Sequence, residues 1–151
     1  MSDFTLSKIS KSDSWATPAN LLAELDAEFH FFRLPDGALD DPCPIGGSGG
    51  LERDWPAVTF LNPPYSKPAP WVRKAYQESL KGRTVVGLLR SDTSTGWYWD
   101  WVKGKAEVRE IRGRLHFNGT KRAAPFASII AIWRPKDNEK VSQESRGYGQ
   151  L

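Results

Sequence analysis

The chain has 151 residues, of which 39% are hydrophobic, 12% aromatic and 26% charged, which is enough for one packed domain. No apolar run approaches the roughly 18–20 residues that span a bilayer, and the first thirteen residues lack the apolar core of a secretory signal. One cysteine and two histidines exclude a disulfide framework and predict that no metal is bound. Together these features predict a soluble cytoplasmic protein with no membrane partner.

The formal net charge of +3 hides an uneven distribution along the chain. Residues 1–60 hold four lysines and arginines against ten aspartates and glutamates, whereas residues 103–122 hold seven against two. Such asymmetry fits either an ordinary solvated surface or a basic face that binds a polyanion such as nucleic acid.

The first part of the chain predicts one helix and two strands. Thr17 is a good N-cap and Pro18 suits the first helical position, and the leucines that follow recur at helical spacing, which predicts a helix over 18–29. A short strand is expected at 38–40. A second, buried strand at 58–61 ends abruptly where two consecutive prolines follow.

The second part predicts two further helices and four strands. The helices are expected over 68–80 and, after the polar cap formed by Ser91, Asp92, Thr93 and Ser94, to about residue 103. The strands are expected at 85–89, 107–111, 115–117 and 128–133. The tryptophan-rich stretch 97–101 fits helix and core packing better than a base-stacking platform.

The order of these elements predicts an α/β fold. Strands alternate with helices first and follow one another later, which is typical of a sheet that is parallel first and antiparallel at its C-terminal end. Ligands of such sheets bind outside the carboxyl ends of the parallel strands. The segments 41–43, 62–65 and 90–93 are therefore expected to meet at one crevice. The predicted organisation is a flexible N-terminus (1–13), one domain (14–134) and a disordered polar tail (135–151).

The run Asn62-Pro63-Pro64-Tyr65 follows an apolar strand directly. It resembles the catalytic signature of S-adenosylmethionine-dependent methyltransferases that act on planar amino groups. Such an amine is conjugated with its ring, so its lone pair is poorly available. The Asn62 side-chain oxygen and the Pro63 carbonyl can accept hydrogen bonds from its two N–H groups, which positions the nitrogen without a general base. Tyr65 offers a flat face for a target base flipped out of a duplex.

Other segments extend this resemblance over roughly residues 13–133. Together they are similar to the small DNA N6-adenine methyltransferases encoded by phages and prophages. In chain order they are Ser14-Trp15-Ala16-Thr17-Pro18, Leu39-Asp40-Asp41-Pro42-Cys43, Asp54-Trp55, the run 62–65, Trp71 with Lys74-Ala75, Gly113-Arg114-Leu115-His116-Phe117 and Pro125-Phe126-Ala127-Ser128.

The resemblance implies roles for particular positions. The catalytic loop would be Asn62, Pro63, Pro64 and Tyr65. The S-adenosylmethionine site would include Trp15, Thr17, Pro18, Asp41, Pro42 and Cys43, with the Asp41 carboxylate meeting the amino group of the cofactor. Arg114 and Phe117 would line the pocket of the target base or of the cofactor.

Further site residues are predicted from their position in the chain. Ser91 and Asp92 lie in a segment expected at the same crevice and are predicted to contact the cofactor. The basic run Arg109, Arg112, Arg114, Lys121 and Arg122 falls on the late strands that border the crevice, which favours contacts with DNA phosphates.

The chain departs from the family pattern between Asp41 and the strand at 58–61. Only sixteen residues separate the two, partly taken by the glycine-rich loop 46–50, whereas a full methyltransferase sheet places two strands and two helices there. A single crossover already needs about 10–12 residues. We therefore predict a truncated Rossmann-like sheet, with the ribose contact supplied by Asp54, by Trp55 or by the segment 91–93, or left weak.

Two alternatives to a DNA N6-adenine methyltransferase stay open on the sequence. The same loop suits any planar amide-like nitrogen, so the acceptor could be adenine in RNA or a glutamine amide in a protein. A nucleic-acid-binding module that kept the fold and lost turnover is favoured by the shortened cofactor side. The intact run 62–65 argues against that module.

Overall fold

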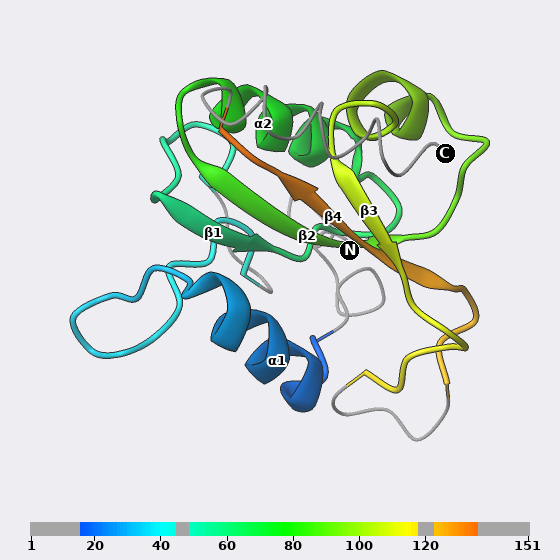
Figure 1. Cartoon of the computed structure of the whole chain (residues 1–151), viewed down its shortest axis with the longest axis horizontal. Helices are drawn as coiled ribbons and strands as arrows, with labels where there is room; N and C mark the ends of the chain where they lie inside the picture. Colours follow the sequence, from blue (N-terminus) through cyan, green and yellow to red (C-terminus); the bar gives the residue numbers. More distant parts are fainter. Residues whose placement is uncertain (1–15, 45–48, 118–122, 136–151) are drawn as a thin grey trace, which may run out of the picture.

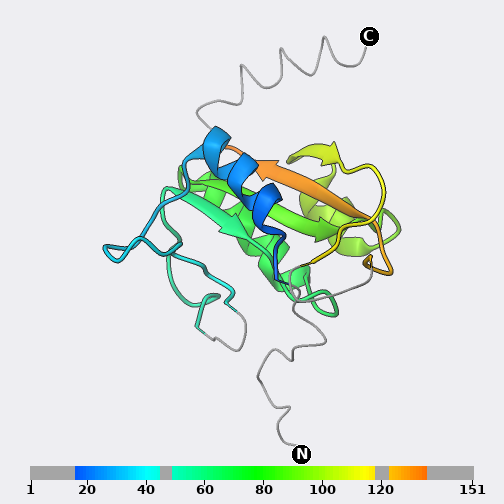
Figure 2. The same ribbon diagram turned by 90° about the horizontal axis from the view of Figure 1, so that it is seen from below.

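The computed structural model describes residues 16–44, 49–117 and 123–135 (Figure 1). A four-stranded sheet lies at its centre, with helix α1 (Ala19–Phe29) on one face. Helix α2 (Ala69–Leu80) and the short π-helix η1 (Tyr98–Val102) cover the other face. In Figure 2, which is seen from below, α1 lies in front of the sheet and runs across its strands. This layering confirms the prediction of an α/β fold.

The strands lie in the order β1-β2-β4-β3, and their bounds are β1 (Val58–Leu61), β2 (Thr84–Arg90), β3 (Glu107–Glu110) and β4 (Ser128–Trp133). The pair β1–β2 is parallel and is joined through α2, whereas β4 runs antiparallel to both β2 and β3. A sheet that is parallel first and antiparallel later is therefore confirmed. The carboxyl ends of β1 and β2 meet at one edge, where β4 begins.

The core forms two layers because successive side chains of a strand point to opposite faces. On β2, Val86 and Leu88 belong to the cluster that includes Leu25 of α1. Their neighbours Val85 and Leu89 belong to the cluster that includes residues of α2 and η1. No helix within the described ranges is long and apolar enough to cross a membrane.

Two predictions in the first part of the chain were wrong. The N-cap of α1 is Pro18, without a side-chain cap, because the hydroxyl of Thr17 accepts a hydrogen bond from elsewhere in the chain. The expected strand 38–40 is a single bridge between Leu39 and Arg33. A local hairpin, closed by the bond from Leu34 N to Ala38 O, takes the backbone groups that a longer strand would need.

In the second part, the helix expected after the polar cap and to about residue 103 is present at residues 96–102, but most of it is the π-helix η1. Within the predicted cap, the Asp92 carboxylate accepts bonds from the backbone and the hydroxyl of Ser94. At the C-terminal end of η1, Lys103 N donates to Tyr98 O, the spacing of a π-helix. The expected strand 115–117 is irregular, since Leu115 O pairs with Ala124 N across a loop.

Candidate active site

The loop Asn62-Pro63-Pro64-Tyr65 begins where β1 ends, at the carboxyl edge of the sheet. The Nδ2 group of Asn62 donates a 3.0 Å hydrogen bond to Oγ1 of Thr17, at the start of α1. This bond joins segments 45 residues apart and fixes the plane of the amide, and with it the direction of Oδ1. Both prolines are buried, which holds the turn rigid.

Tyr65 is enclosed by aromatic rings and is only 5% exposed. Its ring meets Phe126 edge-on, with 4.7 Å between centroids, and Phe117 at 6.0 Å. Burial raises the pKa of the Tyr65 hydroxyl far above its ordinary value of 10.0, against the opposing charge of Arg90. Tyr65 is therefore buried among aromatic rings and presents no exposed face to a base in this structure.

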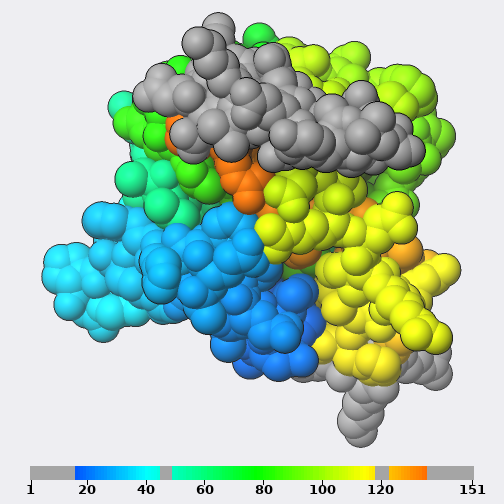
Figure 3. Space-filling model, in the orientation of Figure 1, coloured from blue at the N-terminus to red at the C-terminus, as the bar shows by residue number. Residues whose placement is uncertain are grey.

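Residues 111–117, which follow β3, lie on the same side of the sheet as α1 and Tyr65. In Figure 3 they lie in yellow beside α1, in blue. Arg109 of β3 makes two short bonds to the Glu28 carboxylate of α1 and a third to Glu107. The aromatic cluster around Tyr65 thus lies between the sheet and elements that are tied to each other.

Three buried polar atoms of this region have no hydrogen-bond partner within the described residues: Tyr65 Oη, Arg90 Nε and Ser128 Oγ. Arg90 and Ser128 are register partners on β2 and β4. The outer nitrogen of Arg90 lies 3.6 Å from the Asp92 carboxylate. The sequence placed Arg90 at the crevice without a role and left Ser128 unassigned, because only strand register shows that they are neighbours.

The segment 91–93 lies at the edge of this site. Ser91 N donates to Ala127 O, which fixes the end of β2 against the start of β4. The other two candidates for the ribose contact lie elsewhere: Trp55 is 2% exposed in the core and donates to Gly50 O. Asp54 pairs with Lys81, just beyond the C-terminal end of α2.

Asp41, Pro42 and Cys43 form a tight turn on the α2 side of the sheet. Cys43 N donates a 2.8 Å bond to the Asp41 carboxylate, and Cys43 packs in the cluster of Leu61 and Leu89. Burial raises the pKa of Asp41, although the Cys43 bond and the charge of Arg53 oppose it. The structure therefore brings this turn to the carboxyl ends of β1 and β2, but on the face opposite Tyr65.

The turn is fixed by a close backbone approach at Gly50. A Cβ atom built there would lie 1.7 Å from Pro42 O and 2.9 Å from the Trp71 ring. Only glycine allows this contact. Residues 46–48 of the glycine-rich loop lie outside the described residues.

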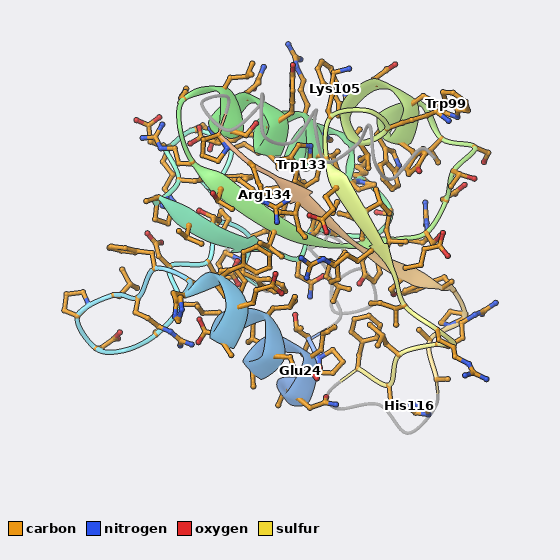
Figure 4. The ribbon with its side chains drawn as sticks, in the orientation of Figure 1. Glu24, Trp99, Lys105, His116, Trp133 and Arg134 are labelled. Atoms are coloured by element: carbon orange, nitrogen blue, oxygen red, sulfur yellow. The ribbon has the colours of Figure 1, made fainter. Side chains whose placement is uncertain are left out.

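The predicted nucleic-acid residues fall into two groups. Arg112 and Arg114 are exposed and form no ion pair with any residue that the structure describes, whereas Arg109 is paired as above and Phe117 is buried. Figure 4 shows His116, in the same segment, pointing away from the sheet. Three further predicted site residues lie outside the described part of the chain: Trp15, Lys121 and Arg122.

Of the tryptophans in the stretch 97–101, Trp97 is buried, as expected for core packing, and Trp99 is 55% exposed. Figure 4 shows Trp99 on the outer side of η1. Among the described residues, no group of three or more histidines, cysteines, aspartates or glutamates is arranged to hold a metal ion.

Comparison with known proteins gives one consistent result. A family model described as DNA N-6-adenine-methyltransferase (Dam) matches residues 5–147. The chain is 33% identical over 109 residues to a DNA N-6-adenine-methyltransferase of Haemophilus phage HP1 (strain HP1c1), covering 67% of this chain and 63% of that protein. It is 30% identical over 110 residues to the protein of that name from Escherichia phage T1, covering 68% and 46%. The matched region thus spans less than two thirds of either relative, and no solved structure matches the chain.

Proposed function

Because the chain belongs to the DNA N-6-adenine-methyltransferase family, we propose that it transfers a methyl group from S-adenosylmethionine to N6 of adenine in double-stranded DNA. The observation that carries the proposal is the hydrogen bond between Asn62 and Thr17 at the carboxyl end of β1. It supports the reading of residues 62–65 as a catalytic loop because a fixed amide is what this chemistry requires.

The loop acts by positioning and by fixed dipoles. The Asn62 side-chain oxygen and the Pro63 carbonyl oxygen accept hydrogen bonds from the two N–H groups of the target amine. They hold the nitrogen still and stabilise the positive charge that develops on it. Since the amide plane is set before the base arrives, little reorganisation accompanies the reaction.

The residues assigned to the cofactor fit a cationic ligand. Asp41 is half-buried, and its carboxylate forms no ion pair with a described residue, while burial raises its pKa. A positive group beside it would relieve that cost. Bound S-adenosylmethionine supplies the methyl group, held by Trp15, Thr17, Pro18, Asp41, Pro42, Cys43, Ser91 and Asp92.

The proposed DNA contacts lie on the segment after β3. Arg112 and Arg114 carry charges that are not neutralised within the described residues and suit phosphates. Lys121, Arg122 and Phe117 complete the set. The target base must leave the duplex because its amino group cannot reach the loop while the base is stacked. Since Phe117 and Phe126 pack against Tyr65, these rings must also separate to receive the base.

At the level of the fold, we propose that the sheet is a truncated Rossmann-like methyltransferase sheet within a domain at 14–134. Its support is the parallel pair β1–β2 with the loop 62–65 at its carboxyl edge. The turn 41–43 reaches the sheet without a regular strand of its own.

The test is transfer of a tritiated methyl group from S-adenosylmethionine to unmethylated DNA, RNA and protein in parallel, followed by mapping of the modified positions. Label in DNA at adenine N6 is the expected result. Label only in RNA or in protein glutamine would refute the DNA assignment. Calorimetric titration with S-adenosylmethionine runs alongside, and no heat at millimolar cofactor would refute the enzyme altogether.

A further inference from the structure

The polar atoms Tyr65 Oη, Arg90 Nε and Ser128 Oγ carry an inference that goes beyond the catalytic loop. All three are buried, and none has a hydrogen-bond partner within the described residues. Groups of this kind are uncommon in folded proteins because their desolvation is not repaid. A molecule bound beside them would supply the missing hydrogen-bond partners.

The three groups face the same side of the sheet. Arg90 and Ser128 lie opposite each other across β2 and β4, and the alternation along both strands places them on the side of Leu88 and Ile130. Tyr65 belongs to that same cluster, and the charge of Arg90 acts to lower the pKa of its hydroxyl against the larger effect of burial. They therefore form one set, on the α1 side of the carboxyl edge.

Asp92 sets how the Arg90 guanidinium is used. The carboxylate lies 3.6 Å from the outer Nη2 atom, whereas Nε is buried. The ion pair with Asp92 thus balances the charge of Arg90, and the buried Nε–H of Arg90 is left to donate to another group. Arg90 is only a donor, and the two hydroxyls can both donate, so the occupant must present hydrogen-bond acceptors.

The rings of Tyr65, Phe117 and Phe126 pack against one another beside this donor set. Hydrogen-bond donors next to aromatic rings suit an aromatic heterocycle that carries acceptor nitrogens in its plane. We propose that Tyr65, Arg90 and Ser128 form a donor site for the ring nitrogens of an adenine. The proposal rests on the proposed function, under which two adenines reach the protein, one in the target nucleotide and one in the cofactor.

Equilibrium binding tests the proposal with the variants Ser128→Ala, Tyr65→Phe and Arg90→Met. One arm titrates S-adenosylmethionine calorimetrically. The other measures the anisotropy of labelled oligonucleotides at saturating S-adenosylhomocysteine, with a single adenine or its 1-deaza, 3-deaza or 7-deaza analogue. If the site holds the target base, the wild type binds the oligonucleotide with one of these analogues about tenfold more weakly than the oligonucleotide with adenine. The variant Ser128→Ala binds the oligonucleotide with that analogue and the one with adenine equally weakly.

A loss of affinity confined to S-adenosylmethionine assigns the site to the cofactor adenine. If neither ligand loses more than about twofold in any variant, the proposal is overturned. These measurements need no turnover. A wild type that transfers no methyl group to DNA would therefore refute the proposed activity while this comparison still gives its own answer.

Thermal unfolding separates ligand binding from a structural role. Removal of an unpaired buried hydroxyl should leave the Tm of Ser128→Ala unchanged or higher, while affinity falls. Ser79→Ala is the matched control, because the buried Ser79 hydroxyl donates to Tyr76 O on α2. The control should lose some stability and no affinity. A lower Tm for Ser128→Ala with unchanged binding would contradict the proposal.

Discussion

The side chain of Asn62 is the residue on which the proposed reaction depends most. Replacement by alanine removes one of the two acceptors that hold the target amine. We expect Asn62→Ala to lower the rate of methyl transfer by roughly 10²–10³-fold, the usual effect of removing one preorganised polar contact. Cofactor affinity, measured by calorimetry, should be nearly unchanged. A substantial residual rate would show that another residue orients the amine.

Thr17 is expected to act through Asn62. The substitution Thr17→Val keeps the shape of the side chain but removes the oxygen that accepts the Asn62 bond. With the amide free to rotate, kcat should fall about tenfold, with little change in KM for DNA. Thr17→Ser keeps the acceptor and should restore the rate. Equal rates for the valine and serine variants would contradict this role.

Asp41 predicts how cofactor binding depends on pH. Because burial raises its pKa, the carboxylate becomes protonated at a higher pH than an ordinary aspartate, whose pKa is 3.8. Affinity for S-adenosylmethionine should therefore fall as the pH is lowered through this raised pKa. In the free protein the sign is opposite, since ionisation of the buried group destabilises the fold as pH rises.

The substitution Asp41→Asn separates these two effects. It removes the charge and keeps an oxygen that can accept the Cys43 bond. The variant should melt no lower than the wild type at neutral pH and bind cofactor at least about tenfold more weakly, without the pH dependence. Calorimetry over a pH series provides the measurement. Unaltered affinity would exclude Asp41 from the site.

At the scale of elements, α2 is joined to the chain before β1 by the buried carboxylate of Glu78. It accepts bonds from Trp55 N and Lys74, and Lys81 also contacts it. Burial alone would raise its pKa, but these bonds outweigh burial and lower it below the ordinary 4.5. The stabilisation is thus present above the unfolded pKa and is lost as pH falls through the folded value.

Removal of this carboxylate leaves the buried Trp55 N–H and the largely buried Lys74 ammonium without their hydrogen-bond acceptor, whereas Lys81 keeps its pair with Asp54. We expect Glu78→Ala to lower the free energy of unfolding by about 3 kcal/mol, measured by urea denaturation at neutral pH. Glu24→Ala, on the exposed surface of α1, is the control and should have little effect. A small loss at Glu78 would mean that Lys74 and Trp55 find water when the carboxylate is absent.

Elements with strong local signals could be predicted from the sequence. The apolar strand 128–133 and the helix at 68–80 were confirmed within one residue, because periodicity and proline placement decide them locally. The conformation of segments 38–40 and 115–117 could not be predicted, because a short segment becomes a strand only if a partner strand lies beside it. The helix expected after the cap 91–94 is present at 96–102, but its local pattern did not predict that most of it is wound as a π-helix.

For the molecule as a whole, the charge asymmetry predicts a salt-dependent interaction with DNA. Alanine at Arg112 or Arg114 should weaken binding about equally across sequences and lower the slope of log affinity against log salt by about 1 per charge. Arg33→Ala is the control, since that arginine lies beyond the C-terminal end of α1 and pairs with Asp26. Fluorescence anisotropy over a salt series measures both. Unchanged slopes would make the segment ordinary solvated surface.

The candidate site shows the limit of sequence reasoning at this scale. The loop 62–65 is contiguous, so its motif could be read directly. The set formed by Tyr65, Arg90 and Ser128 comes from three segments joined by strand register. The covering of Tyr65 by Phe126 likewise depends on how a connection between strands folds back. Neither contact can be predicted from the spacing of residues within one segment of the sequence.

The exposed ring of Trp99 gives the protein an optical reporter. The other described tryptophans are buried or half-buried, so a water-soluble quencher such as iodide should act first on emission from Trp99. Lys103 lies 4.3 Å above this ring and attracts such an anion. The indole N–H donates to Thr93 O, next to Ser91 and Asp92. Fluorescence from one side chain should therefore follow what happens at the end of β2 when a ligand arrives, without any added label.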